Sequence, residues 1–152
     1  MKLRPKKSAR ENASRLLPRL AEEFFAAGDE SIQEKRPQEV HPFRILTKRF
    51  RYALEYFRPC YGSALDSYLE MLRELQRELG DLNDSHSSRL VFRDLLRTEN
   101  RSARNKKLFA ALDLCEQELT QKFRAHWQKT FESPTMRTRF MRYLSHPPKG
   151  KK

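Results

Sequence analysis

The feature that most constrains this chain is the spacing of its apolar residues, which recur every three or four positions through most of its 152 residues. That spacing is typical of amphipathic helices, whereas the alternation that marks a strand never extends beyond a few residues. Glycine occurs at only four positions, each where a helix would end or a tail begin. The pattern therefore predicts an all-α protein, an antiparallel bundle of about five to six helices with a four-helix core.

Proline and glycine indicate where the expected helices begin and end. The expected ranges are about 8–27, 40–57, 64–79, 85–96, 103–131 and a short helix around 140–144. Pro18 either kinks the first helix or marks its start. Pro37 or Pro42 lies in the first turn of the second helix, and the sequence does not choose between them.

Two glycines and two polar residues are candidate helix caps. Gly28 and Gly80 are expected to end the first and third helices, because glycine readily adopts the left-handed conformation of a C-cap. Asp84 or Ser85 would then cap the next helix through its side-chain oxygen. The connections between helices are short, so neighbouring helices are expected to run antiparallel.

The chain shows no internal repeat and no boundary that would divide it into two domains. The sequence therefore predicts one helical bundle over residues 8–145, preceded by a basic tail over residues 1–7. Residues 146–152, HPPKGKK, contain nothing suited to a core. They are expected to form a second basic tail that is disordered.

Lysine and arginine total 32 against 20 acidic residues, and the net charge of +12 is unevenly distributed. The two ends of the chain and the segment 41–58 hold the excess, whereas residues 11–40 are net acidic and residues 59–133 balance. Such a charge favours attraction to nucleic acid, polyphosphate or an anionic membrane surface, although it also serves solubility. The tails are expected to add only loose attraction, whereas the segment 41–58 is expected to be ordered.

The cysteine content and the N-terminal sequence indicate the cellular compartment in which the protein occurs. Cys60 and Cys115 are too few for a disulfide framework and favour a reducing environment. The basic N-terminus lacks the apolar stretch that a signal peptide requires, and no segment is long and apolar enough for a membrane span. We therefore expect a cytoplasmic protein without a membrane partner.

The segment 41–57, HPFRILTKRFRYALEYF, separates cations from apolar residues on a helical wheel. One side carries His41, Arg44, Lys48, Arg51, Tyr52 and Glu55, with Arg49 at its edge. The other side carries Phe43, Leu46, Phe50, Ala53, Leu54 and Phe57. We expect the apolar side to pack into the bundle and the basic side to form a strip about 21 Å long.

A strip of like charges stacked one per turn is unfavourable unless something neutralises it. A bound polyanion would do so, with arginine forks and the lysine ammonium contacting phosphate oxygens. The alternative is pairing with acids elsewhere in the fold; Glu55 can pair with Arg51, which would also orient that guanidinium. His41 either contacts phosphate or makes a structural hydrogen bond, and Tyr52 either donates to the ligand or packs.

The pattern H-x-x-R-x-x-x-K-R-x-R-Y-x-x-E, from His41 to Glu55, resembles the signature helix of the conserved histidine α-helical domain (CHAD) family. The segment LRELQRELGDLND, from Leu72 to Asp84, is similar to a second motif of that family, and HWQKTFESP, residues 126–134, to its closing helix. The resemblance implies a helical bundle that binds inorganic polyphosphate through a basic surface. Association with polyphosphate granules would follow.

The resemblance also implies roles for individual residues. The basic positions of the first motif are occupied by His41, Arg44, Lys48, Arg49 and Arg51. Arg73 takes the place of a lysine in the second motif, and Gln76 and Asp84 match its polar positions. Gln76 lies on the packing side and is expected to form a buried hydrogen-bonded link, while Asp84 has the alternative role of an N-cap.

CHAD proteins usually contain two such bundles in tandem, related by a pseudo-twofold axis with a basic centre between them. This chain has one histidine motif and about half that length. Either a homodimer supplies the second bundle or binding is weaker. We favour the homodimer, because twofold contacts are the commonest form of self-assembly.

No catalytic set is apparent, so we expect a protein that is not an enzyme and needs no cofactor or metal. His86, His126 and His146 lack metal-ligand spacing, and no glycine-rich phosphate loop is present. Two alternatives to polyphosphate binding remain: an RNA- or DNA-binding protein, which needs aromatic residues free to stack on bases, and a structural adaptor with an exposed apolar groove. Most aromatic residues lie on apolar stripes, which favours an anion without bases.

Overall fold

The computed structural model describes residues 3–34, 40–96 and 103–148, and every regular element in those ranges is helical. Its elements are α1 (Ala9–Ser31), α2 (His41–Phe57), the short 3₁₀ helix η2 (Arg58–Cys60), α3 (Ala64–Leu95), α4 (Ala103–Thr130) and α5 (Pro134–Ser145). The predicted all-α bundle is confirmed, with five α-helices in the described part of the chain.

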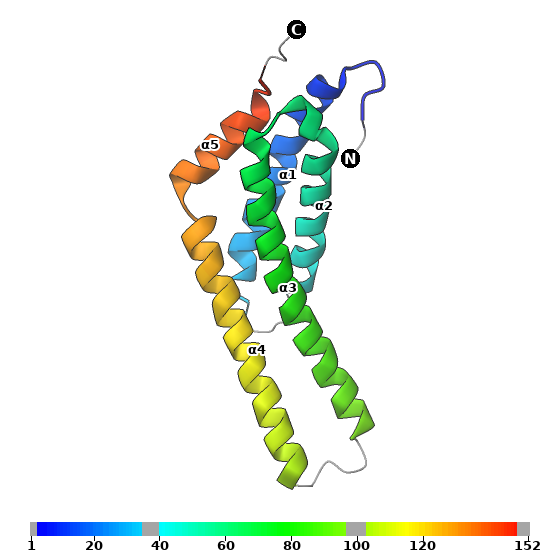
Figure 1. Cartoon of the computed structure of the whole chain (residues 1–152), viewed down its shortest axis with the longest axis vertical. Coiled ribbons are helices and arrows are strands. Elements are labelled where there is room, and N and C mark those ends of the chain that lie inside the picture. Colours follow the sequence, from blue (N-terminus) through cyan, green and yellow to red (C-terminus); the bar gives the residue numbers. More distant parts are fainter. Residues whose placement is uncertain (1–2, 35–39, 97–102, 149–152) are drawn as a thin grey trace.

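The helices form an elongated bundle in which α3 and α4 are much longer than their neighbours (Figure 1). Contacts join α1 to α2, α2 to α3, α3 to α4, and α1 to α5. One half of α3 and one half of α4 pack with α1 and α2, and α5 covers the end that holds both termini (Figure 1). The other halves project beyond α1 and α2 as a two-helix hairpin (Figure 1). None of the described helices combines the length and apolar character needed to cross a membrane.

The first helix begins at a capping box and continues past both residues that were expected to limit it. Ser8 accepts a hydrogen bond from the backbone of Glu11, and Glu11 accepts one from the backbone of Ser8. Pro18 lies inside α1 and does not mark its start. Gly28 is not a C-cap, because α1 runs on to Ser31. A Cβ atom at Gly28 would lie 2.0 Å from the Trp127 ring, so glycine is needed there for the close approach of α4.

The second helix begins at His41 with Pro42 in its first turn, and it ends at Phe57. The expected range is confirmed to within one residue, and Pro42 is the proline that starts the helix. Pro37 lies outside the described residues. The prediction of a disordered C-terminal tail also lies largely outside them, since the description ends at residue 148.

The third and fourth expected helices are a single helix, because α3 continues through Gly80 to Leu95. Ending a helix at Gly80 was wrong, and Asp84 and Ser85 are interior residues of α3, not N-caps. A glycine in a helix interior costs only about 1 kcal/mol relative to alanine. Leu79 and Leu82, each 1% exposed, flank Gly80 and pack into the core, which outweighs that cost.

Replacing Gly80 with alanine is expected to stabilise the protein by about 0.5–1 kcal/mol. A Cβ atom at this position would meet no atom within 4 Å, so the gain in helix propensity carries no steric penalty. The shift of the urea unfolding midpoint at constant m-value measures this gain. An unchanged or lower midpoint would contradict the continuity of α3 at this residue.

Aromatic side chains from α1, α2 and α4 form the centre of the core. Phe24 lies 5.1 Å from Phe50 and 5.3 Å from Trp127, measured between ring centroids. Trp127 also contacts Phe43 at 5.3 Å, in an edge-on arrangement that aromatic rings favour. These contacts hold the apolar side of α2 against the bundle, so its basic side faces outward.

Candidate functional site

The orientation of α2 in the bundle agrees in its main features with the orientation predicted from the helical wheel. Its buried residues are Phe43, Thr47, Phe50, Leu54 and Phe57, whereas Leu46 and Ala53 are half-buried. Thr47 was not expected in the core, and its hydroxyl is satisfied by donating to the carbonyl of Phe43. The basic side is accessible: His41, Arg49 and Tyr52 are exposed, and Arg44, Lys48, Arg51 and Glu55 are half-buried.

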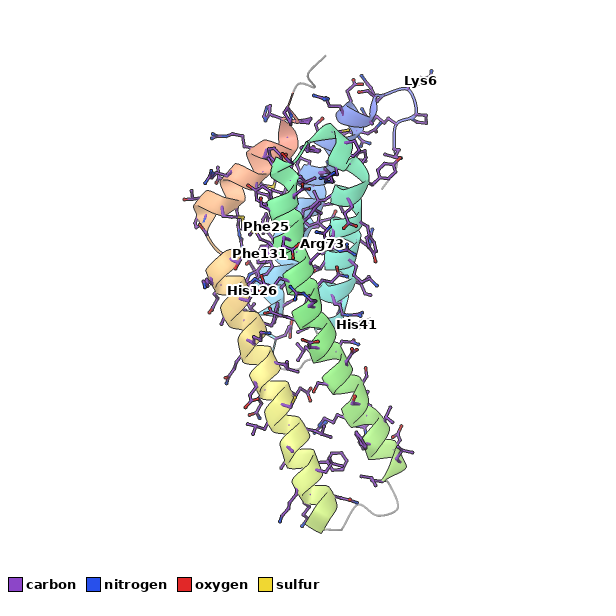
Figure 2. The ribbon with its side chains drawn as sticks, in the orientation of Figure 1. Lys6, Phe25, His41, Arg73, His126 and Phe131 are labelled. Carbon is purple, nitrogen blue, oxygen red and sulfur yellow. The ribbon has the colours of Figure 1, made fainter. Side chains whose placement is uncertain are left out.

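The basic side of α2 runs along α3, and the line of contact between the two helices is named here the α2–α3 seam. Figure 2 shows His41 near the end from which the hairpin projects, and Arg73 of α3 further along the same pair of helices. Cations from both helices therefore border the seam.

At one end of the seam, Arg51 is held by two hydrogen bonds. Its Nε donates to Oε1 of Gln76 at 2.6 Å, and its Nη1 donates to Oε1 of Glu55 at 2.6 Å. The guanidinium also lies over the Tyr52 ring, with Cζ 4.4 Å from the centroid. The side chain of Arg51 is only 15% exposed, so its orientation is fixed before any ligand arrives.

Arg73 joins the same group from α3. Its Nη2 donates to Oε1 of Glu55 at 3.2 Å, and its Nη1 donates to Glu70 at 3.2 Å. These bonds to Glu70 and Glu55 raise the pKa of Arg73. A surface hollow here is lined by Arg51, Glu70, Arg73, Gln76 and Arg77. Three cations thus border a hollow whose lining includes one acid.

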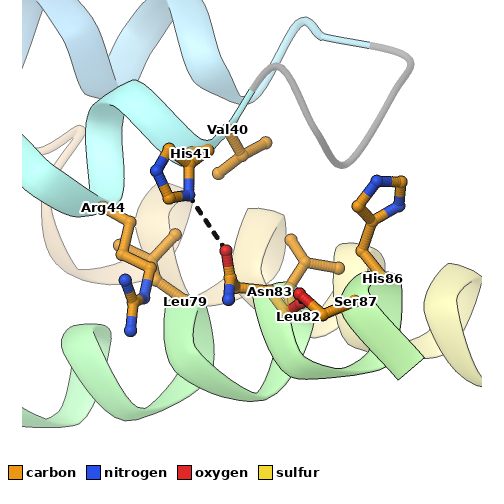
Figure 3. A pocket seen from close by; sticks show the side chains of 8 residues that line it. All are labelled: Val40, His41, Arg44, Leu79, Leu82, Asn83, His86 and Ser87. Carbon is orange, nitrogen blue, oxygen red and sulfur yellow. Dashed lines mark hydrogen bonds between the residues drawn. The ribbon is translucent and has the colours of Figure 1, made fainter. Parts of the chain in front are cut away.

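At the other end of the seam lies a cavity of about 350 Å³ (Figure 3). It is lined by Val40, His41, Arg44, Leu79, Leu82, Asn83, His86 and Ser87. His41 Nδ1 donates to Oδ1 of Asn83 at 2.9 Å, because an amide oxygen only accepts. His41 therefore makes the structural hydrogen bond that was one of its two expected roles, and its Nε2 has no hydrogen-bond partner among the described residues.

Arg44 has an unsatisfied donor beside this cavity. Its Nε atom is buried and has no hydrogen-bond partner among the described residues. An unmet buried donor costs about 1–3 kcal/mol, so the Arg44 side chain carries an uncompensated penalty in the free protein. Figure 3 shows Arg44 and His41 projecting from α2 toward α3.

The structure thus divides the predicted residues into groups. His41 and Arg44 share the cavity, Arg51, Arg73 and Gln76 share the hollow, and Glu55 links Arg51 with Arg73. Lys48, Arg49, Tyr52 and Asp84 line neither space. Within the part of the chain that the structure describes, Arg44, Lys48 and Arg49 form no ion pair with an acid.

Four residues at the seam were missed by the sequence interpretation: Arg77, Asn83, His86 and Ser87. Gln76, Gly80, Asn83 and Ser87 follow one another at intervals of three and four, which places them on one face of a continuous helix. Because the third helix was predicted to end at Gly80, the sequence analysis did not place these four residues on one helix face. Gly80 lies on that face between the cavity and the hollow, and it carries no side chain to separate them.

The remaining histidines of the bundle make contacts that link α3 with α4. His126 Nδ1 lies 2.7 Å from Glu78, which is 7% exposed, and His86 Nδ1 lies 3.3 Å from Glu116. A search of the described ranges for three or more His, Cys, Asp or Glu side chains placed to hold a metal ion found none. These pairs therefore act as cross-links between α3 and α4.

Comparison with known families adds to this geometry. Residues 2–96, more than half of the chain, match the CHAD domain, a family of binding domains that is associated with polyphosphate and is not known to be catalytic. The match contains both helices of the α2–α3 seam and ends before α4, so the segment 126–134 lies beyond it. No curated protein and no solved structure matches the chain. This protein belongs to the CHAD domain family, as a member with a partial, half-length match.

Proposed function

We propose that this protein binds inorganic polyphosphate along the α2–α3 seam. The observation that carries the proposal is the convergence of Arg51 and Arg73, from two helices, on the single carboxylate of Glu55, while Arg44 and Lys48 have no acidic partner among the described residues. Binding is expected in the cytoplasm, where CHAD proteins typically occur, and on polyphosphate granules in cells that contain them.

The dimensions of the seam suit a linear polyanion better than a single phosphate. From His41 to Arg51, α2 rises about 15 Å. Arg44 and Lys48 lie between these residues, each separated from the next cation by about one helical turn. A chain of phosphates lying along the seam would meet a cation at each turn, and Arg73 and Arg77 would contact it from α3.

Individual side chains contribute in different ways. Arg51 is preorganised, so little side-chain entropy is lost when its guanidinium contacts phosphate oxygens. Arg44 supplies a guanidinium that no acid neutralises among the described residues, and Lys48 supplies a flexible point charge. Glu55 supports the site by reducing repulsion between Arg51 and Arg73 in the absence of ligand.

Nucleic acid is the second candidate, because Tyr52 and Tyr56 are 51% and 70% exposed on α2 and exposed aromatic rings can stack on bases. Their surroundings argue against that use. One face of the Tyr52 ring is covered by the Arg51 guanidinium, and Tyr56 packs edge-on against Phe57 with centroids 4.9 Å apart. An anion without bases therefore fits this surface better.

Competition between the two ligands tests the proposal. Long-chain polyphosphate is expected to displace a labelled single-stranded oligonucleotide from the protein at a lower phosphate concentration than the reverse exchange requires. Both titrations need the same ionic strength, because the affinity for either polyanion falls steeply with salt. Fluorescence anisotropy follows both exchanges. An oligonucleotide that displaced labelled polyphosphate with equal ease would favour the nucleic-acid function.

A further inference from the structure

The projecting halves of α3 and α4 have no core of their own. These segments, residues 83–95 of α3 and 103–122 of α4, are named here the distal hairpin. The buried apolar side chains end at Leu82 on α3 and resume at Phe123 on α4. Among the described residues of the distal hairpin none is apolar and buried; those that are buried are Asn105 and Glu116.

Large apolar side chains instead face solvent on this hairpin. Val91 and Leu95 of α3 are 56% and 70% exposed, and Leu114 of α4 is 57% exposed. Apolar stripes on packed helices are normally covered, and two helices alone cannot enclose a core, whereas four can.

The spacing of the exposed residues resembles the contact stripe of a coiled coil. On α3 the stripe is formed by Asp84, Ser88, Val91 and Leu95, at intervals of four, three and four. On α4 the residues Lys107, Ala111, Leu114 and Glu118 repeat the same intervals. All eight are exposed, and this spacing is the one by which helices interlock side chains with a partner helix.

The charges of the hairpin identify the partner. Its half next to the bundle, residues 83–88 and 113–122, contains four acidic residues and one lysine. Its outer half, residues 89–95 and 103–112, contains five lysines and arginines and one acidic residue. The two halves of the hairpin have similar lengths on α3 and opposite net charges. A second identical hairpin running in the opposite direction would therefore place each basic half against an acidic half.

We propose that the distal hairpin is the docking surface for a second copy of this chain, packed antiparallel about a twofold axis so that two hairpins form a four-helix bundle. The apolar members of the two stripes, Val91, Leu95, Ala111 and Leu114, are buried in the centre of that bundle, and each basic outer half contacts the acidic half of the partner. A parallel arrangement would instead bring like charges together, which disfavours it. The dimer does not depend on a bound ligand.

Two complementary charge variants of the full chain test the arrangement. The first, Arg93→Glu with Lys107→Glu, removes the net positive charge of the outer half; the second, Asp84→Lys with Glu118→Lys, reverses the net negative charge of the inner half. All four side chains are exposed, and none forms an ion pair within the described residues. Each variant alone is expected to dissociate, with a dimer dissociation constant raised on the order of 100-fold or more. An equimolar mixture is expected to recover dimers, because the introduced glutamates then face the introduced lysines, and the unaltered acidic half of one chain meets the unaltered basic half of the other.

Sedimentation velocity at high micromolar concentration distinguishes the outcomes, and circular dichroism verifies that each variant is folded. A wild-type chain that is monomeric overturns the proposal, whether or not another protein binds the hairpin. So does either variant remaining dimeric alone, or a mixture that remains monomeric. Arg44→Glu with Lys48→Glu, at the α2–α3 seam, serves as the control and is expected to leave the dimer intact, which separates failure of this interface from failure of polyphosphate binding.

Discussion

Reversing the charge of Arg44 and Lys48 with glutamate is expected to abolish polyphosphate binding while the protein remains folded. The two residues occupy the middle of the α2–α3 seam, and neither pairs with an acid within the described residues. The double substitution therefore replaces two cations that are free to meet phosphate with two anions that repel it. A loss of affinity of about 100-fold or more is expected, since like charges brought together at a binding surface cost several kcal/mol.

A matched control variant distinguishes a loss of affinity caused by changes at the α2–α3 seam from a loss caused by the lower net charge. Arg139 and Arg142 on α5 are exposed, and Arg139→Glu with Arg142→Glu changes the net charge by the same amount away from the seam. Only a modest weakening is expected for this control. Isothermal titration calorimetry at moderate salt measures both variants, and far-ultraviolet circular dichroism checks their helicity. Equal losses in the two variants, or continued binding by the seam variant, would show that the seam is not the site.

The basic helix could be predicted closely from sequence because all the information is local. The intervals between Phe43, Phe50 and Phe57 define one buried side of α2, and the cations between them must then lie on another. Pro42 and Pro59 mark the two ends of the helix within a few residues. The same intervals do not show what lies opposite the cations, so the pairing of Arg51 with Gln76 was not foreseen, although both residues had been singled out.

The continuity of α3 could not be predicted in the same way. Gly80 is a local signal for a helix end, and it was outweighed by Leu79 and Leu82, whose burial depends on helices distant in sequence. The wrong helix boundary also affected the prediction of the binding-site residues. Asn83, which accepts a hydrogen bond from His41, fell in the connection between two expected helices, so its orientation could not be predicted.

Gly28 is a second residue whose role depends on a helix distant in the sequence. Its position at the end of an apolar stripe suggests a C-cap, and nothing nearby in the sequence indicates otherwise. The reason for glycine there is Trp127, which approaches from α4. Trp127 is fully buried, and its indole Nε1 donates to Asp29 at 3.0 Å. Hydrogen bonds from Arg137, together with the one from Trp127, lower the pKa of Asp29 and keep this carboxylate available as an anchor for the indole.

Gly28→Ala is therefore expected to destabilise the protein by about 2–3 kcal/mol, although alanine is the better helix former. The added Cβ atom would lie 2.0 Å from Cη2 and 2.1 Å from Cζ2 of Trp127. The ring has little room to retreat, because Phe131 is stacked on it at 4.9 Å and its Nε1 is tied to Asp29. Urea unfolding monitored by circular dichroism gives the change in the free energy of unfolding.

A double-mutant cycle with Trp127→Phe shows whether the indole is the cause. Phenylalanine lacks the outer ring of tryptophan, which contains the three atoms nearest to a Cβ placed at Gly28. The alanine substitution should therefore cost markedly less in the Trp127→Phe background than in the wild type, with a coupling energy of about 1 kcal/mol or more. Additive effects of the two substitutions would place the strain elsewhere. The opposite signs expected for alanine at Gly28 and at Gly80 follow from one difference: a neighbouring helix touches the first position and leaves the second open.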